Sequence, residues 1–247
     1  MNNHIKIDVK NREIFLKKPL LKKIYYKYFE EIKKNLNNEI QGDILEIGSS
    51  GFIKEIIPTC QTSNLEKNDS MIDLEENVYS LNVKRNSISN FVLIDIFHHL
   101  EYPKLALKNM YEALTANGRI IMIEPSMGLI PRLIYKIFHH EPNGFNLNIQ
   151  WEKIPELIPN KNDYFAAQSI PWRAFIKKEI NLDNKFQIKK VECFSDFAFL
   201  CSGGFSYKSF YPMKFLRFIQ IIDNILTKIS FKIFSARMII ILEKKNN

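Results

Sequence analysis

The sequence is poor in cysteine and has no long apolar run. Its three cysteines are spread over 247 residues, too few and too far apart for a disulfide framework or a cysteine-based metal site. No stretch reaches the roughly 18 apolar residues that a membrane span requires, and the N-terminus lacks the apolar core of a signal peptide. These absences predict a soluble, cytoplasmic protein without a metal site.

The basic residues are not gathered into one stripe. The formal net charge of +8 comes from 35 Lys and Arg against 27 Asp and Glu, a balance that suits nucleic acid or an anionic membrane. The lysines, however, are scattered among Asn and Ile, without interleaved aromatic residues. We therefore expect no nucleic-acid partner. The hydrophobic content of 46% is ample for a packed core.

The most informative stretch covers residues 42–57. An apolar run, Ile44–Ile47, is followed by the small-residue turn Gly48–Gly51 and by a second apolar run. This order predicts a buried strand, a tight loop and a short helix. Glycine and serine keep side-chain bulk away, so backbone N–H groups of such a loop can approach a ligand. Glu46 ends the strand, where ligands bind in open α/β sheets, although α/β proteins that bind nothing also contain such turns.

Strand and helix patterns alternate from residue 42 to residue 125. Further strands are expected at residues 59–65, 88–96 and 119–124, and a helix at residues 103–114, which Gly118 ends in a left-handed conformation. The alternation predicts an α/β, Rossmann-like, doubly wound and mostly parallel sheet with helices on both faces. Residues 1–18 are expected to be a polar start. An amphipathic helix at residues 19–36 is expected to pack on the sheet rather than to form a lid.

Four of the five histidines form two adjacent pairs, at positions 98–99 and 139–140. Histidine suits the role of a general base because its pKa lies near neutrality. His98, His99 and His139 are the candidates, with strand capping or a solvated helix end as the alternatives. A metal site of His139, His140 and Glu141 is disfavoured because adjacent ligands on a helix diverge.

Three segments together carry a family resemblance. Residues 44–51, the Asp95–Leu100 segment with its D-x-x-H-H-L pattern, and residues 114–119, which are similar to an L-x-P-G-G turn, occur in this order and spacing. They resemble the class I S-adenosylmethionine-dependent methyltransferases of the methyltransferase type 11 group, over about residues 40–126. The resemblance implies S-adenosylmethionine as the cofactor and methyl transfer as the reaction.

The resemblance also implies roles for individual residues. The cofactor-binding set that it implies is Glu46, Gly48, Ser49, Ser50 and Gly51 along the methionine part, Asn64 and Glu66 at the ribose, Asn77 near the adenine, and Asp95. This chain departs from the family pattern because serines replace glycines in a shorter turn, and because Asn64 and Asn77 stand where acidic residues are usual. Losing those carboxylates would weaken each contact by about 1–3 kcal/mol. A degenerate, non-catalytic binding protein of the same fold is therefore the alternative function.

Residues beyond 126 suggest the acceptor class. Residues 137–142, 168–172 and 200–206 are similar to a bacterial subset of these enzymes that is associated with surface-polysaccharide or lipid-linked glycan genes. The resemblance implies a small-molecule or glycan acceptor. We expect four parts: an N-terminal helical segment at 1–41, a cofactor-binding core at 42–126, a substrate cap at 127–185, and strands with an amphipathic helix at 186–247 that complete the sheet.

The last part contains a basic amphipathic segment at residues 210–234. Nine apolar residues recur there beside Lys214, Arg217, Lys228 and Lys232. Such a helix can lie in a membrane interface, which would place the protein at the inner membrane face. Burial against the sheet is the favoured interpretation. The flanking runs at 186–199 and 238–242 are expected to be antiparallel strands.

Overall fold

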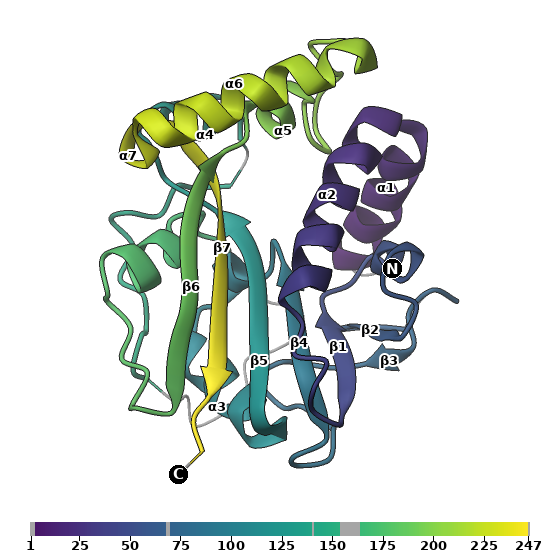
Figure 1. The fold of residues 1–247 in the computed structure, drawn as a ribbon, viewed down its shortest axis with the longest axis vertical. Coiled ribbons are helices and arrows are strands. Elements are labelled where there is room, and N and C mark those ends of the chain that lie inside the picture. The colour runs from purple at the N-terminus through teal and green to yellow at the C-terminus, as the bar shows by residue number, and fades with distance from the viewer. Residues whose placement is uncertain (1–2, 68–69, 140, 154–163, 247) are drawn as a thin grey trace.

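A computed structural model describes residues 3–67, 70–139, 141–153 and 164–246, and its centre is a seven-stranded sheet (Figure 1). The strand order is β3-β2-β1-β4-β5-β7-β6. The strands are β1 Asp43–Ile47, β2 Cys60–Asn64, β3 Leu74–Glu75, β4 Ile88–Ile94, β5 Leu114–Pro125, β6 Phe186–Ser195 and β7 Ser235–Lys244. The order and the pairings below confirm the predicted fold class.

The sheet is parallel except at one edge. Strands β3, β2, β1, β4 and β5 pair in parallel, whereas β7 pairs antiparallel with both β5 and β6. The predicted antiparallel character of the last two strands is therefore confirmed. Because the five parallel strands end at the same edge, the loops that follow them gather there.

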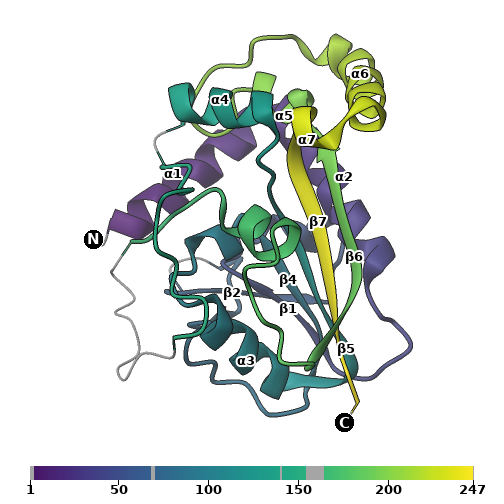
Figure 2. The same ribbon diagram turned by 90° about the vertical axis from the view of Figure 1, so that its left-hand side faces the viewer.

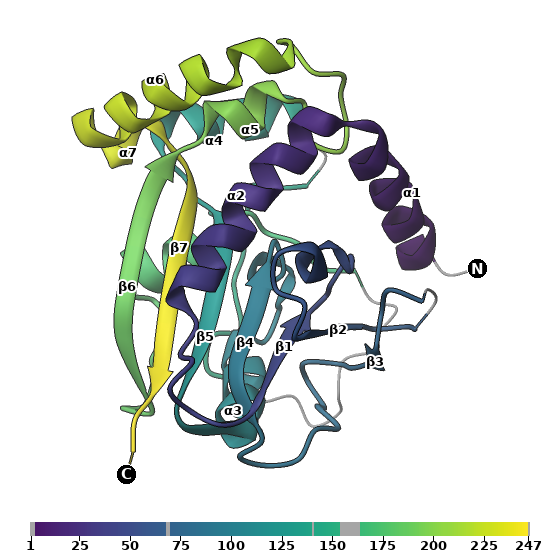
Figure 3. The same cartoon turned by 45° about the vertical axis from the view of Figure 1, so that its right-hand side comes forward.

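The central strands are covered on both faces, which explains their continuously apolar sequences. In β4, Phe91 and Leu93 pack in one hydrophobic cluster, and Val92 packs in another on the opposite face. The first cluster includes α3 (Pro103–Ala113), and the second includes α2 (Pro19–Asn35). Figure 3 shows α2 lying across the sheet. The seven buried side chains of α2 confirm its predicted packing role.

In the described ranges, the remaining helices are the N-terminal α1 and four helices that follow β5 in the chain. They are α1 Asn3–Lys17, α4 Leu129–Phe138, α5 Phe197–Cys201, α6 Leu216–Ile229 and α7 Phe231–Phe234, with the short turns η1 Phe52–Glu55, η2 Phe97–His99, η3 Trp172–Ile176 and η4 Met213–Phe215. Helices α4, α5, α6 and α7 form a layer beyond the carboxyl ends of the parallel strands (Figures 1 and 2). Among the described residues, no helix has the length and apolarity to cross a membrane.

The polar start forms a helix of its own, α1, which Phe15 anchors by stacking its ring on Phe52 at 4.1 Å. One local prediction, at the end of α3, was wrong. The left-handed residue after α3 is Asn117, with φ of 61°, rather than Gly118. Asparagine adopts this conformation through local hydrogen bonding. Gly118 serves close backbone approach instead, because a Cβ there would lie 2.9 Å from the carbonyl oxygen of Thr115.

The favoured burial of residues 210–234 was also wrong. Helix α6 buries only Leu216 and Asp223, and most of its large apolar side chains are exposed. The helix is held to the molecule by a polar contact, as described below. In the predicted cap, Ala167, Ile170 and Phe175 pack into the hydrophobic cluster that contains α3. His140 and residues 154–163 of the predicted cap lie outside the described residues. The predicted boundaries of the four parts of the chain stay predictions.

Candidate functional site

A cavity of about 680 Å³ lies at the carboxyl ends of the parallel strands. Its walls come from α1, α2, α4, the turns after β1, β2 and β4, and residues 203–210. Cavities of this size hold small-molecule ligands and cofactors. Ten of the twelve predicted site residues line it, namely Glu46, Gly48, Ser49, Ser50, Asn64, Asn77, Asp95, His98, His99 and His139.

Hydrogen bonds within the loop after β1, and from the loop to β1 and β2, hold it in place. The Ser49 amide donates to the Ser63 carbonyl at 2.7 Å, and the Ser49 hydroxyl accepts from the Gly51 amide at 2.8 Å. The same hydroxyl donates to the carboxylate of Glu46. Gly48 has φ of 68°, and a Cβ there would lie 2.2 Å from Cδ1 of Ile96. The sequence therefore needs glycine at this position of the cavity wall.

Glu46 lies beneath this loop and is 5% exposed. Burial raises the pKa of Glu46 to about 7, against a smaller opposing effect of the Ser49 hydrogen bond. The carboxyl group is therefore poised between its neutral and charged forms near neutral pH. A cationic or hydrogen-bond-donating ligand in the cavity would favour the charged form.

Two predicted residues do not line the cavity. Gly51 begins η1 with φ of 86°, and a Cβ there would lie 2.6 Å from Cβ of Met71, so its role is in shaping the turn. Glu66 lies after β2 but outside the wall, whereas the buried Glu76 lines it. Glu76 accepts a hydrogen bond from the Asn82 amide at 2.8 Å.

The two asparagines in the predicted ribose and adenine positions both stabilise turns. Asn64 donates its side-chain amide to the Ser49 carbonyl at 3.2 Å and accepts from the Leu65 amide at 2.8 Å. Asn77 accepts from the Tyr79 amide at 2.9 Å. Their predicted contacts with a cofactor stay predictions, because the hydrogen bonds seen here are internal to the chain.

Asp95 follows β4 and, although 26% exposed, forms an ion pair with the buried Arg237 of β7. Arg237 is 2% exposed, and its two terminal nitrogens both bond the carboxylate. The Tyr25 hydroxyl donates to the same carboxylate at 3.0 Å. Burial opposes ionisation of Asp95, but the charge and hydrogen bonds of Arg237 outweigh it and lower the pKa of Asp95. Asp95 is therefore an anion on the cavity wall.

His98 is buried between two carboxylates. Its Nδ1 lies 2.8 Å from Oε2 of Glu124, and its Nε2 lies 3.5 Å from Oε2 of Glu141. Burial lowers the pKa of His98, but its hydrogen bonds to both carboxylates and their charges outweigh burial and raise the pKa to about 10. A histidine that keeps its proton at neutral pH is not suited to the role of a base.

His99 has the opposite electrostatic character. Burial and the charge of His98 lower the pKa of His99 to about 4. Its Nδ1 lies 3.0 Å from the Phe165 carbonyl, which can only accept, so the proton of the neutral ring lies on Nδ1. The Nε2 lone pair is thereby left on the side of Glu141, whose Oε1 is 3.8 Å away. Of the two adjacent histidines, His99 is the one held neutral.

His139 caps the C-terminal end of α4, and its Nδ1 lies 3.8 Å from Oε2 of Glu141. Its Nδ1 accepts a hydrogen bond from the Glu141 amide at 3.2 Å, and the ring packs edge-on against Tyr135. This geometry matches the alternative interpretation of His139, in which it is a residue at the end of a helix rather than a base. Because His139 still lines the cavity, its role as a base stays a prediction.

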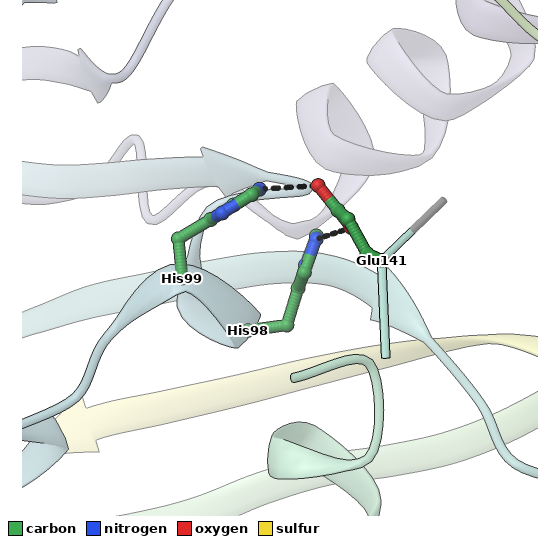
Figure 4. A group of neighbouring side chains, drawn as sticks. All are labelled: His98, His99 and Glu141. Atoms are coloured by element: carbon green, nitrogen blue, oxygen red, sulfur yellow. Dashed lines mark ion pairs between the residues drawn. The ribbon is translucent and has the colours of Figure 1, made fainter. Parts of the chain in front are cut away.

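The side chains of His98, His99 and Glu141 converge, as Figure 4 shows, with ligand atoms within 4.8 Å of one another. Three such groups could hold a divalent cation, and each histidine Nδ1 has a partner that would fix its orientation. The carboxylate of Glu141, however, already accepts hydrogen bonds from Tyr164 and Gln168 and pairs with His98. A protonated His98 therefore balances the cluster, and the expected lack of a metal site stays a prediction.

The raised pKa of His98 leads to a testable pH dependence. The protonated form is stabilised in the fold, so the contribution is fully present below the ordinary pKa of 6.5 and is lost as pH rises toward about 10. We expect urea-unfolding free energies to fall more steeply between these pH values for the natural protein than for His98→Gln, which cannot titrate. Unfolding free energies that change with pH in the same way in both proteins would contradict the raised pKa of His98.

Several residues of the site were not predicted. Glu124, fully buried, accepts hydrogen bonds from the amides of Ile96 and Phe97 at 2.8 and 2.6 Å. Its place at the end of an apolar strand is the signal that also marked Glu46. Arg237 gave no such signal, since it meets Asp95 only through the antiparallel register of β7.

Comparisons with known proteins agree with this architecture. No family model matches the chain, and no curated protein sequence matches it significantly. Solved structures do match. A Thermotoga maritima S-adenosylmethionine-dependent methyltransferase, described as a possible histamine N-methyltransferase, has a TM-score of 0.53 and 15% identity, covering 94% of this chain and 93% of that one.

Two further structures lead to the same conclusion. An S-adenosylmethionine-dependent methyltransferase of Archaeoglobus fulgidus has a TM-score of 0.51 and 11% identity over 90% of this chain and 94% of that one. A Haloferax volcanii methyltransferase, solved with the Trm112 activator, has a TM-score of 0.53 and 8% identity over 100% and 99%. On these similarities, the chain has the fold of the class I S-adenosylmethionine-dependent methyltransferases.

Proposed function

We propose that the protein transfers a methyl group from S-adenosylmethionine to an acceptor held in the same cavity. The observation that carries this proposal is the convergence of ten predicted site residues on one cavity at the carboxyl edge of the sheet. The wall there combines a close-approach glycine, Gly48, with the carboxyl groups of Glu46 and Asp95. Such a wall suits a ligand with a cationic amino acid part.

The residues present fit the proposed cofactor. Glycine at position 48 lets the Ile96 side chain pack against the loop backbone at the cavity wall, and Glu46 can accept from an ammonium group. S-adenosylmethionine, when bound, supplies an activated methyl group on a sulfonium. The protein then has to align the acceptor and exclude water, and a volume of about 680 Å³ leaves room for both molecules.

His99 is the proposed general base for a hydroxyl acceptor. Its neutral form has a lone pair on Nε2, and its ring is held by the Phe165 carbonyl. The protonated His98 and the carboxylate of Glu141 both lie beside His99. A proton that arrives at Nε2 of His99 would be stabilised by the negative charge of Glu141, whose Oε1 is 3.8 Å away. The base is weak, which suits an acceptor that is attacking an already activated methyl group.

Replacing His99 with alanine is expected to lower kcat by about 10²–10⁴-fold, the usual contribution of a general base. S-adenosylmethionine affinity should change little. Because the pKa of His99 is about 4, the natural enzyme should keep a constant rate from about pH 5 to neutrality. His139→Ala is the matched control, because His139 also lines the cavity and also lies beside Glu141. Equal losses in both variants, or an unchanged kcat in His99→Ala, would remove His99 as the base.

The proposed acceptor class is a small molecule or glycan. It is tested by incubating the protein with methyl-labelled S-adenosylmethionine and fractions of hydroxylated acceptors. A calorimetric titration with S-adenosylmethionine and S-adenosylhomocysteine comes first, and a dissociation constant near the micromolar range, about −8 kcal/mol, supports an active enzyme.

The alternative function is a binding protein of this fold that does not catalyse methyl transfer. It is favoured by the internal hydrogen bonds of Asn64 and Asn77, which occupy polar atoms expected at the cofactor. Cofactor binding without label transfer to any acceptor fraction would support it. No binding of either ligand at millimolar concentration would remove the methyl-transfer proposal.

A further inference from the structure

The exposed apolar side chains are concentrated on one side of the molecule. Of the 20 large hydrophobic side chains that are exposed in the described part of the chain, 15 lie in residues 129–138 and 207–233. We call these two segments the apolar helical face. They comprise α4, η4, α6 and most of α7, which lie together beyond the strand ends in Figures 1 and 2.

The exposed side chains follow helical stripes. In α4 the exposed residues Leu129, Leu133 and Ile137 are four positions apart. In α6 the exposed set is Phe218, Ile221, Ile222, Ile225 and Ile229, again at spacings of three and four. Each helix therefore turns a continuous apolar stripe to the surface. An amphipathic helix that packs on a globular core instead turns its polar face to the solvent and its apolar face inward.

Helix α6 is attached to the protein through a polar contact. Asp223, 4% exposed, accepts hydrogen bonds from the Ser195 hydroxyl and the Phe197 amide at 2.8 and 2.7 Å. Thr227 accepts from the Ser195 amide at 2.8 Å. These bonds hold inward the side of α6 that carries Asp223 and Thr227, whereas Arg217 and Lys228 stay exposed beside the outward apolar stripe.

The charge on this face has one sign. It contains Arg132, Lys136, Lys208, Lys214, Arg217, Lys228 and Lys232, all exposed. Its single acidic residue is the buried Asp223. We propose that the apolar helical face binds to the surface of an anionic lipid bilayer, with its apolar stripes in the interface and its cations among the headgroups. Basic amphipathic helices bind bilayers in this way.

The charge distribution distinguishes a bilayer from a second copy of the chain. A two-fold dimer through this face would bring seven exposed cations against seven others, with no exposed carboxylate on either side. An anionic bilayer instead supplies both an apolar layer and the opposite charge. The attraction to each cation is screened by salt, whereas burial of the apolar stripes is not.

The face is continuous with the rim of the cavity. Phe138, Tyr207 and Phe210 are exposed, yet each also lines the cavity. The Tyr207 hydroxyl donates to the Phe138 carbonyl at 3.0 Å, which joins α4 to residues 203–210 at the rim. A bilayer on this face would therefore lie against the cavity mouth. The inference, resting here on the proposed function, is that the acceptor is a molecule anchored in the bilayer whose polar part enters the cavity.

Vesicle flotation tests the bilayer contact without any substrate. We expect the natural protein to float with vesicles of phosphatidylglycerol mixed with phosphatidylcholine, and much less with phosphatidylcholine alone. Affinity should fall as salt is raised. Each cation replaced by glutamine, at Lys214, Arg217 or Lys228, is expected to weaken binding about fivefold. The pair Phe218→Asp and Ile225→Asp should weaken it tenfold or more.

A matched control is available on another part of the surface. Ile188 of β6 is exposed to a similar degree, and Ile188→Asp should leave flotation unchanged. All variants should keep the thermal midpoint and the S-adenosylmethionine affinity of the natural protein, because none of the altered residues lines the cavity. Failure of the natural protein to bind anionic vesicles would overturn the proposal. So would a stable dimer that Phe218→Asp dissociates.

The acceptor part of the inference has a separate test. Methyl-labelled S-adenosylmethionine is incubated with the protein and either the membrane or the aqueous fraction of the source cells. Label extracted with lipids from the membrane fraction is the expected result. Label found only in aqueous products would overturn the anchored acceptor while leaving methyl transfer intact. No label in either fraction, with vesicle binding retained, would remove the proposed reaction and with it the anchored acceptor.

Discussion

Gly48→Val is expected to abolish measurable S-adenosylmethionine binding, a loss of at least about 100-fold, or ~2.7 kcal/mol. Gly48 has φ of 68°, and its added Cβ would lie 2.2 Å from Cδ1 of Ile96. A β-branched side chain does not tolerate this conformation. The loop after β1 would therefore shift, and its backbone would leave the position from which it can contact the cofactor. Calorimetric titration of the variant measures the effect.

Gly51→Ala is the control for backbone strain. Gly51 also has a positive φ of 86°, and its added Cβ would meet Met71, but it does not line the cavity. We expect this variant to lose about 1–2 kcal/mol of unfolding free energy and to bind the cofactor within a few-fold of the natural protein. Undiminished binding by Gly48→Val would show that the cofactor does not lie on this loop. Equal losses in both variants would indicate general strain instead.

Arg237→Met is expected to cost about 1–3 kcal/mol of unfolding free energy, because it removes the cationic partner and the hydrogen bonds of the Asp95 carboxylate, which is 26% exposed. Arg237 also stacks over the ring of Phe199, with the guanidinium carbon 4.2 Å from the ring centroid. Methionine retains part of that packing, so the loss reports chiefly on the charge. Urea unfolding at neutral pH measures it.

The pH dependence and a second substitution separate charge from packing. Arg237 lowers the pKa of Asp95, so the stability from this pair is present above the unfolded pKa of about 3.9 and is lost as pH falls below it. The difference in unfolding free energy between the natural protein and Arg237→Met should therefore become smaller in acid. Adding Asp95→Asn to Arg237→Met should restore part of the stability. The exposed pair Arg85–Glu112 gives the comparison, and Arg85→Met should cost less than about 1 kcal/mol. An equally small cost for Arg237→Met would contradict the ion pair of Asp95 with the buried Arg237.

The order of strands and helices was predictable because it depends on local pattern. Continuously apolar runs such as residues 91–94 can only be covered on both faces, and the periodicity of residues 19–36 fixes which side of α2 packs. The residues at strand ends were predictable for a related reason. Parallel strands bring their carboxyl ends to one edge, so Glu46 and Asp95 had to lie near each other.

The partners of those residues were not predictable in the same way. Asp95 and Arg237 are 142 positions apart, and nothing near either in sequence indicates the pairing. The two adjacent histidines read alike in sequence, yet burial and the carboxylates of Glu124 and Glu141 separate their pKa values to about 10 and about 4. Protonation state is a property of the environment, and the environment is assembled from distant segments.

The sequence by itself determined the order of strands and helices along the chain, the mostly parallel sheet and the loop at Gly48, since each follows from local hydrophobicity and backbone freedom. The tertiary structure decided the order of the strands in the sheet, which of the two adjacent histidines is held neutral, and which way α6 faces. The amphipathic pattern of α6 suits a buried helix and an interfacial helix equally well. The hydrogen bonds of Asp223 to Ser195 and Phe197 hold the Asp223 side of the helix inward, and only the packing of residues that are distant in sequence could reveal that orientation.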